Sequence, residues 1–210
     1  MDKDELASKL TDLHIKVLKE ILRGESYPHI KEKYHHEFEV LNYEQIIIHQ
    51  AHRLTFDADD NVIGAYPVSP LPTPHKITVA GVGTGYAMCA IDALGAAHTF
   101  QAPVSIESST TKTQQPVNLV ISPTEPAPSS DQVVAFNQLD YASLQDLVAA
   151  NAQLAVDACP SINFYDTRDD VPEHLTALDF PTAVTEARTI FDYDGIRNHI
   201  LQSLTMKTTQ

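Results

Sequence analysis

The chain has 210 residues, 43% of them hydrophobic, and carries 14 basic against 28 acidic side chains, a formal net charge of −14. A chain of this size can bury one good core, or one core with a small satellite domain. Acidic residues outnumber basic ones in residues 1–60 (13 against 8) and in the remainder (15 against 6). Proteins that bind phosphate backbones or anionic membranes need a basic excess, so we expect neither nucleic acid nor a membrane as a partner.

The N-terminus is acidic and lacks the apolar core of a signal peptide. No apolar run approaches the roughly 18 residues that a membrane span requires. We therefore expect a cytoplasmic protein whose two cysteines, Cys89 and Cys159, are reduced thiols rather than a disulfide.

The first predicted element is a helix over residues 3–23. Asp2 is a candidate N-cap, with Glu5 placed for a capping box, and Gly24 is a candidate C-terminal stop. Apolar residues recur at spacings of three and four: Leu6, Leu10, Leu13, Val17 and Ile21.

A break at Pro28 and a charged, weakly helical stretch precede a predicted helix over residues 42–54. Two short strands follow, at residues 54–56 and 62–66, around a turn. Helices followed by a hairpin are the order of a winged-helix module. The helix over residues 42–54 offers only Arg53 as a fixed cation, which argues against DNA binding.

The proline-rich stretch 67–74 predicts a boundary between an N-terminal domain (1–70) and a second domain (75–210). In the second domain we predict strands at residues 76–82, 104–108, 117–122, 132–136 and 161–165, and helices at 84–98, 143–157, 172–178 and one ending near residue 204. Because the strands surround single helices without a regular βαβ alternation, we predict an α+β fold. The glycine-rich run 81–85 lacks the Lys-Ser/Thr of a phosphate loop, and we expect a flexible strand-to-helix turn there.

Three side chains are candidates for both catalysis and metal binding: Cys89, Asp92 and Cys159. Cys89 and Asp92 are three residues apart, so a helix would place the thiol and the carboxyl on one face. Thiolates suit soft metals, and a buried carboxyl can hold a proton and deliver it as a general acid. The alternative interpretation is structural, because free cysteines are often buried as small hydrophobic residues.

The run Cys89-Ala90-Ile91-Asp92-Ala93-Leu94 is similar to the Cys-Ala-x-Asp-x-Leu motif of the organomercurial lyases (alkylmercury lyases, the MerB family). The two cysteines of the chain fall on that family's two working positions. With gaps, the resemblance extends from about residue 42 to residue 204. One departure is Met88, where the best-known members have tryptophan.

The resemblance implies a winged-helix-like N-terminal domain followed by a NosL/MerB-like mixed sheet with flanking helices. It implies protonolytic cleavage of a carbon–mercury bond, giving hydrocarbon and Hg(II). Cys89 and Cys159 would bind the metal as thiolates, with Asp92 moving the proton and available as a further ligand. It implies no organic cofactor, since mercury is substrate and product. Its expected partners are organomercurial small molecules, low-molecular-weight thiols that release the product, and a mercuric reductase that accepts Hg(II).

Two alternatives remain beside a lyase. One is a relative that binds a soft metal without cleaving a carbon–metal bond, and the other is a winged-helix regulator that senses metal or oxidant through its thiols. Asp92 favours the lyase over the first, because simple metal binding needs no proton shuttle. The acidic N-terminal part argues against the second.

Overall fold

The structure of the protein is a computed structural model that describes residues 1–136 and 159–206. Helices and strands are combined without a regular βαβ repeat, so the α+β prediction is confirmed. The helix predicted over residues 143–157 lies outside the described residues. Within the described ranges, none of the helices has both the length and the apolar character of a membrane span.

The helices are α1 (Lys3–Leu22), α2 (Tyr27–Lys33), α3 (His35–Val40), α4 (Ala90–Phe100), α7 (Phe180–Phe191) and α8 (Tyr193–Met206). Short helical turns occur at Glu44–Ile48 (π) and at Cys159–Ser161 and Arg168–Asp170 (3-10). The strands are β1 (Leu54–Phe56), β2 (Val62–Ala65), β3 (Val68–Ser69), β4 (Lys76–Val79), β5 (Gly83–Ala87), β6 (Val104–Ser109), β7 (Pro116–Ile121), β8 (Val133–Phe136), β9 (Phe164–Tyr165) and β10 (Thr176–Asp179).

The main sheet has seven strands in the order β1-β2-β3-β5-β4-β6-β7, and a second sheet has the order β10-β8-β9. Every pairing among the described strands is antiparallel, so the predicted mixed sheet is wrong. β5 and β6 do run in the same direction, joined through α4. They lie on either side of β4, and each pairs with it antiparallel.

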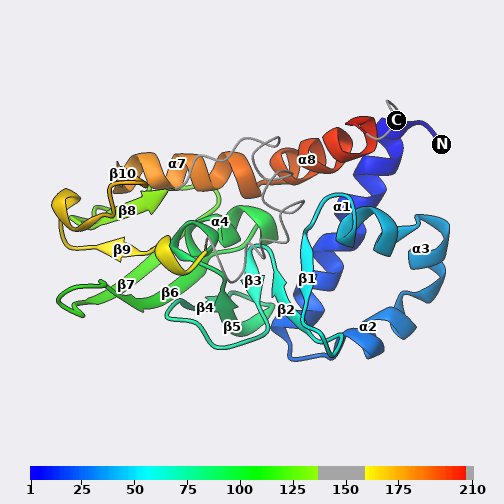
Figure 1. The fold of residues 1–210 in the computed structure, drawn as a ribbon, viewed down its shortest axis with the longest axis horizontal. Coiled ribbons are helices and arrows are strands. Elements are labelled where there is room, and N and C mark those ends of the chain that lie inside the picture. The colour runs from blue at the N-terminus through cyan, green and yellow to red at the C-terminus, as the bar shows by residue number, and fades with distance from the viewer. Residues whose placement is uncertain (137–158, 207–210) are drawn as a thin grey trace.

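Helix α4 lies at the centre of the molecule, between the main sheet and α7 (Figure 1). All its residues are buried. Gly95 permits the close approach of α7, because a Cβ at this position would collide with the Phe191 ring. Thr99 also donates a hydrogen bond to the Phe191 carbonyl at 2.7 Å. The residues at the start of α4 therefore belong to a helix that is packed tightly against α7.

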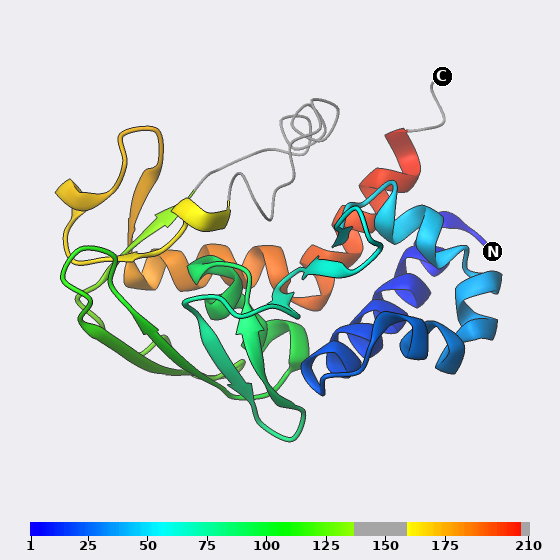
Figure 2. The ribbon, with the colours of Figure 1, turned by 60° about the horizontal axis from the view of Figure 1, so that its bottom comes forward.

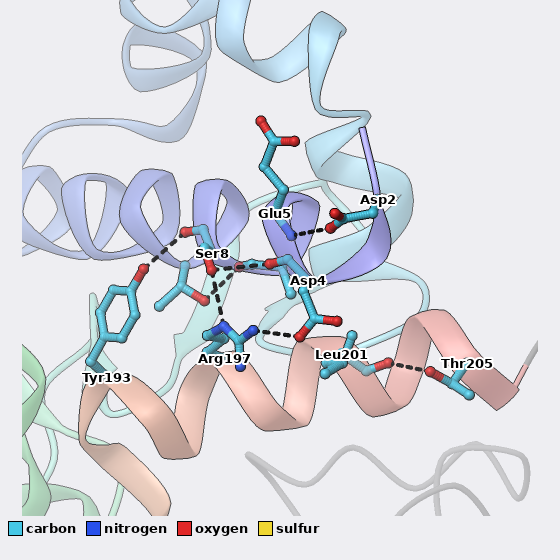
Figure 3. Close-up of polar contacts among 10 residues, drawn as sticks. Asp2, Asp4, Glu5, Ser8, Tyr193, Arg197, Leu201 and Thr205 are labelled. Atoms are coloured by element: carbon cyan, nitrogen blue, oxygen red, sulfur yellow. Dashed lines mark hydrogen bonds and ion pairs between the residues drawn. The ribbon is translucent and has the colours of Figure 1, made fainter.

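Helix α1 forms as its sequence predicts and packs against α8 (Figure 3). The Asp2 carboxylate accepts a hydrogen bond from the Glu5 N–H at 2.8 Å, so the predicted N-cap is confirmed. Arg197 on α8 contacts the Asp4 carboxylate at 2.6 Å and the Ser8 hydroxyl at 2.9 Å. These contacts join the first helix of the chain to its last described one (Figures 1 and 2).

The N-terminal region differs from the prediction after α3. The helix predicted over residues 42–54 is confirmed only in part: a π-helical turn forms at Glu44–Ile48, and it is followed by His52 at φ 50° and by strand β1. The β1–β2 hairpin joins the main sheet through β3, and Arg53, the one fixed cation of the predicted helix, is 4% exposed. The winged-helix prediction is therefore not confirmed.

Strand β3 lies inside the proline-rich stretch where we expected a domain boundary. It pairs with β2 on one side and β5 on the other, so the main sheet continues through that stretch. One hydrophobic core extends from α1 to α8. The division into residues 1–70 and 75–210 stays a prediction.

Near the C-terminus, the helix predicted over residues 172–178 is wrong, because strand β10 forms there and pairs with β8. The predicted final helix is two helices, α7 and α8, which meet at Asp192. The extended backbone of Asp192 (φ −70°, ψ 171°) ends α7. Its carboxylate accepts a hydrogen bond from the Gly195 N–H at 2.7 Å, so the same residue caps α8.

Candidate functional site

Cys89 lies at the junction between strand β5 and helix α4. It is the N-cap residue of α4, with an extended backbone (φ −153°, ψ −177°). The predicted helix over residues 84–98 therefore begins too early, because residues 83–87 form a strand instead. The thiol and carboxyl motif is placed by a strand-to-helix junction rather than by a continuous helix.

Packing against α1 explains the early strand. Gly83 and Gly85 of β5 lie directly against Leu22 of α1. A Cβ on Gly83 would be 3.0 Å from the Leu22 carbonyl oxygen, and a Cβ on Gly85 would be 2.8 Å from the Leu22 side chain. Gly81, at φ 72°, makes the turn between β4 and β5. The predicted strand-to-helix turn at residues 81–85 is thus wrong: these glycines form a hairpin turn and a strand that needs close backbone approach.

Asp92 is the third residue of α4 and lies beside the Cys89 thiol. The Cys89 Sγ–H donates to Asp92 Oδ2 at 2.7 Å. Both residues are 3% exposed. The second carboxyl oxygen, Oδ1, is buried and has no hydrogen-bond partner in the described part of the chain. A buried carboxyl with one free oxygen is suited to carry a proton rather than a fixed charge.

Cys159 approaches the same point from a distant part of the sequence. It begins the 3-10 turn Cys159–Ser161, and its carbonyl accepts a hydrogen bond from the Ile162 N–H at 3.0 Å. The Ile162 carbonyl in turn accepts from the Ala90 N–H at 3.0 Å, so the two cysteine segments are hydrogen-bonded to each other. Sγ of Cys89, Sγ of Cys159 and a carboxylate oxygen of Asp92 all lie within 4.8 Å of one another.

The segment that carries Cys159 is held by a buried histidine. His75 Nε2 is 3.1 Å from Asn163 Oδ1, and Nδ1 is 2.9 Å from the Ser108 hydroxyl. Because the Asn163 amide oxygen accepts, Nε2 carries the proton and Nδ1 accepts from Ser108. Burial lowers the pKa of His75 to about 4, so the ring is neutral and bridges the strands around Cys159.

Burial dominates the electrostatics of the site. It raises the pKa of Asp92 from 3.8 to about 7, against the hydrogen bond from Cys89 and the charge of Arg53, which lower it. Burial also raises the pKa of the Cys89 thiol well above its usual value. Arg53 is itself buried, which lowers its pKa to about 10, while Asp92 raises it. Asp92 therefore exchanges its proton near neutral pH beside a thiol that stays protonated.

Tyr66 is a site residue that the sequence analysis missed. Its hydroxyl oxygen is 3.8 Å from Cys159 Sγ, and burial, followed by the neighbouring Cys159 and Asp92 charges, raises its pKa above the usual value. Arg53 was also missed as a site residue, since it was considered only as a DNA contact. Neither lies in a recognisable motif, and both reach the site through the fold of β1 and β2.

All three predicted site residues are brought together. In the described ranges, the group of three or more His, Cys, Asp or Glu side chains placed to hold a metal ion consists of Cys89, Asp92 and Cys159. Two thiols are soft ligands, and the carboxyl can accept a proton from one of them. The site can therefore bind a soft metal and move a proton at the same place.

Comparison with known proteins identifies the family. The sequence model of MerB, alkylmercury lyase, matches residues 68–192, a range that contains all three site residues. A comparison with curated proteins finds no match. Among solved structures, one described as the mercury-bound form of MerB2 shares the fold. The alignment covers 97% of this chain and 99% of that one, with a TM-score of 0.60 and 17% identity. Because the family model matches more than half of the residues of this chain, the chain belongs to the alkylmercury lyase (MerB) family.

Proposed function

We propose that the protein is an organomercurial lyase that cleaves a carbon–mercury bond by protonolysis, using Cys89, Cys159 and Asp92. The observation that carries the proposal is the buried cluster of two thiols and one carboxyl within 4.8 Å, in a chain whose sequence matches the alkylmercury lyase family. The solved structure with the same fold is described as mercury-bound.

The first step is the capture of the organomercurial by a thiol. The Cys89 proton is engaged with Asp92, so we assign the first sulfur–mercury bond to Cys159. The Cys159 proton leaves to solvent, and the bond between mercury and its counter-ligand, a halide or a solution thiolate, breaks as that ligand departs as an anion. The product of this step is a Cys159–S–Hg–R adduct, in which R is the hydrocarbon group. Sulfur is the protein ligand that suits a soft cation such as mercury.

The second step moves a proton from Cys89 to carbon by way of Asp92. The 2.7 Å contact between Cys89 Sγ and Asp92 Oδ2 supplies the path for the first transfer. The Cys89 sulfur then bonds to mercury, the carbon–mercury bond breaks, and its electron pair takes the proton from Asp92. The balance is one S–H bond and one C–Hg bond lost, and one C–H bond and one S–Hg bond gained.

A carboxyl with a pKa of about 7 suits both halves of this transfer. Near neutral pH it is ionised often enough to accept a proton, and once protonated it is a ready acid. The hydrocarbon and the bis-thiolate Hg(II) complex are the products. Low-molecular-weight thiols would then remove Hg(II), which a mercuric reductase could accept. The scheme uses side chains alone and requires no organic cofactor.

The test is to incubate the full chain with a phenylmercury salt and excess thiol and to measure benzene in the headspace. The wild type and a Ser203→Ala control, altered at a buried residue of α8, should release benzene at similar rates. Cys89→Ser and Cys159→Ser should each reduce the rate by about a thousandfold or more.

Tight binding of one Hg(II) per chain without benzene would contradict the proposal. It would assign the protein to the alternative in which a relative of the lyases binds a soft metal and no carbon–mercury bond is broken.

A further inference from the structure

Tyr66 stands apart from the other residues of the thiol site in its exposure. Cys89, Asp92 and Cys159 are at most 7% exposed, whereas Tyr66 is partly exposed. Its hydroxyl nevertheless reaches Cys159 Sγ at 3.8 Å. A substrate that binds the buried sulfurs must share space with the groups around them, and Tyr66 is the one of these four residues that also reaches the surface.

The backbone of Tyr66 is fixed on both sides. Its N–H donates to the Arg53 carbonyl at 3.2 Å, and the carbonyl of the next residue, Pro67, accepts from the Met88 N–H at 3.3 Å. Tyr66 lies in the bend between β2 and β3, where Ala65 pairs with Val68. Because Met88 directly precedes Cys89, the bend that carries Tyr66 is hydrogen-bonded to the segment that carries the Cys89 thiol.

The Tyr66 hydroxyl is a neutral group in this site. An ordinary phenol titrates at about 10 and therefore keeps its proton at neutral pH. A neutral hydroxyl can accept from the Cys159 thiol and, after rotation, donate to the Cys159 sulfur once that sulfur has lost its proton. It can therefore hold the sulfur in place before and after mercury binds.

We propose that Tyr66 positions the Cys159 sulfur through its hydroxyl and limits, through its ring, the size of the hydrocarbon group that the site accepts. The inference rests on the proposed lyase function and adds a specificity-determining residue to it. It makes two separate predictions: loss of the hydroxyl affects the Cys159 sulfur, and loss of the ring changes the size of the hydrocarbon group that is accepted.

The experiment compares Tyr66→Phe, which removes only the hydroxyl, with Tyr66→Ala, which also removes the ring. The matched control is Tyr193→Phe on α8, whose hydroxyl donates to the Ser8 carbonyl at 3.3 Å, away from the thiols (Figure 3). The two substrates are phenylmercury and 4-tert-butylphenylmercury salts, which present the same aryl–mercury bond with different bulk. The measured quantity is kcat/KM for each.

Tyr66→Phe should lower kcat/KM about fivefold for both substrates, because one hydrogen bond to the working sulfur is lost and the ring remains. Tyr66→Ala should raise the preference for the bulkier substrate about tenfold over that of the wild type. Tyr193→Phe should change neither value. If Tyr66 had a merely structural role, Tyr66→Ala would lower kcat/KM equally for both substrates and leave the preference between them unchanged.

A second measurement does not depend on lyase activity. The alkylation rates of Cys159 by iodoacetamide and by N-(1-pyrenyl)maleimide are compared by peptide mass spectrometry in the same variants. Tyr66→Ala should favour the bulky reagent about tenfold relative to the wild type, and Tyr66→Phe should not. If Tyr66→Ala fails to fold, Tyr66→Leu supplies the reduction in size.

The two proposals fail in different ways. If the wild type releases hydrocarbon and the Tyr66 variants match it in both rate and preference, the inference about Tyr66 is overturned and the lyase stands. If the wild type releases no hydrocarbon, the lyase proposal fails, and the alkylation rates decide the role of Tyr66. If Tyr66→Ala leaves the relative alkylation of Cys159 by the two reagents unchanged, the inference about Tyr66 is overturned. A tenfold change in favour of the bulky reagent would support the inference.

Discussion

Two aspartates in this protein have opposite surroundings. Asp92, in the thiol site, has one thiol donor, one oxygen to which none of the described residues donates, and a pKa raised by burial to about 7. Asp166 follows strand β9 and lies where that strand meets the β6–β7 hairpin. It accepts hydrogen bonds from the Thr110 hydroxyl at 2.9 Å, from the Thr113 N–H at 3.2 Å and from the Thr113 hydroxyl. These bonds, Thr113 first, lower the pKa of Asp166.

The two carboxyls differ first in burial, since Asp92 is 3% exposed and Asp166 is partly exposed, and second in the supply of donors. At Asp166 the chain provides enough hydrogen bonds to fix a charged carboxylate, which then ties two segments together. At Asp92 burial makes the carboxyl costly to ionise, and the described residues leave Oδ1 without a donor, so the carboxyl retains a proton up to about neutral pH. Incomplete satisfaction of a buried polar group is unusual in folded proteins and common where chemistry is done. The comparison therefore separates an aspartate that ties two segments together from the one to which we assign the proton transfer.

The largest expected effect is on catalysis. In the proposed mechanism Asp92 passes the proton to carbon, so we expect benzene release from phenylmercury to fall about a thousandfold in Asp92→Asn. Asp166→Asn should stay within about threefold of the wild type, since its contacts serve the hairpin. Initial rates of both purified variants at pH 7.5 provide the test. Equal losses in the two variants would remove the distinction between the aspartates.

The identity of the site residues could be predicted from sequence, but their arrangement could not. Cys89, Asp92 and Cys159 were found because the motif around Cys89 resembles a known family. The meeting of the two thiols depends on the hydrogen bond between Ala90 and Ile162, which joins residues far apart in the chain. Tyr66 carries no local pattern that points to a thiol, so only the fold reveals its position.

Stability should change in opposite directions in the two aspartate variants. The pKa of folded Asp92 lies above its ordinary 3.8, so the folded state binds that proton more tightly, and stability falls as the pH rises from about 4 to about 7. Asp92→Asn removes this cost. We expect its free energy of unfolding at pH 8 to exceed that of the wild type by up to about 4 kcal/mol, with the gain shrinking as the pH is lowered toward 4.

For Asp166 the sign reverses. Its lowered pKa means that the ionised carboxylate stabilises the fold above its ordinary pKa, and this contribution is lost as the pH falls through the folded-state pKa. Asp166→Asn should therefore be less stable than the wild type at pH 8. Urea denaturation of both variants and the wild type at several pH values measures these differences. A destabilised Asp92→Asn at pH 8 would contradict the proposed cost of the buried charge.

The pH dependence of catalysis should follow Asp92. Because Asp92 must be ionised to accept the Cys89 proton, kcat/KM should rise with pH through about 7. The charge of Arg53 lowers the pKa of Asp92, so Arg53→Gln should move this rise to higher pH. Arg23→Gln, which removes a partly exposed cation paired with Glu20, is the control and should leave the profile in place. An identical profile in Arg53→Gln would exclude Arg53 from the electrostatics of the site.

The fold shows the same limit of prediction as the site. Helix α1 was predicted because its signals are local: the Asp2 cap, an apolar face at helical spacing and Gly24 at φ 83°. Strands β5 and β10 were read as helix because each is set by distant partners. Gly83 and Gly85 need to approach α1, and β10 pairs with β8. Local sequence patterns predict elements, such as α1, whose signals are close together in the chain. A strand depends on partners that are distant in the sequence, and the local pattern does not indicate which they are.

The smallest expected effect tests the donors of Asp166 one at a time. Thr113 provides the largest contribution to the lowered pKa of Asp166, through its hydroxyl. Thr113→Val keeps the shape of the side chain and the backbone N–H but removes this hydroxyl, so the pKa of Asp166 should rise toward its ordinary value. The carboxyl carbon shift of Asp166, followed by NMR as a function of pH, measures the change. Benzene release should equal that of the wild type, because the Thr113 hydroxyl bonds to Asp166 and Thr110 rather than to a residue of the thiol site. A Thr113→Val variant with an unchanged Asp166 pKa would show that the Thr113 hydroxyl is not what lowers that pKa.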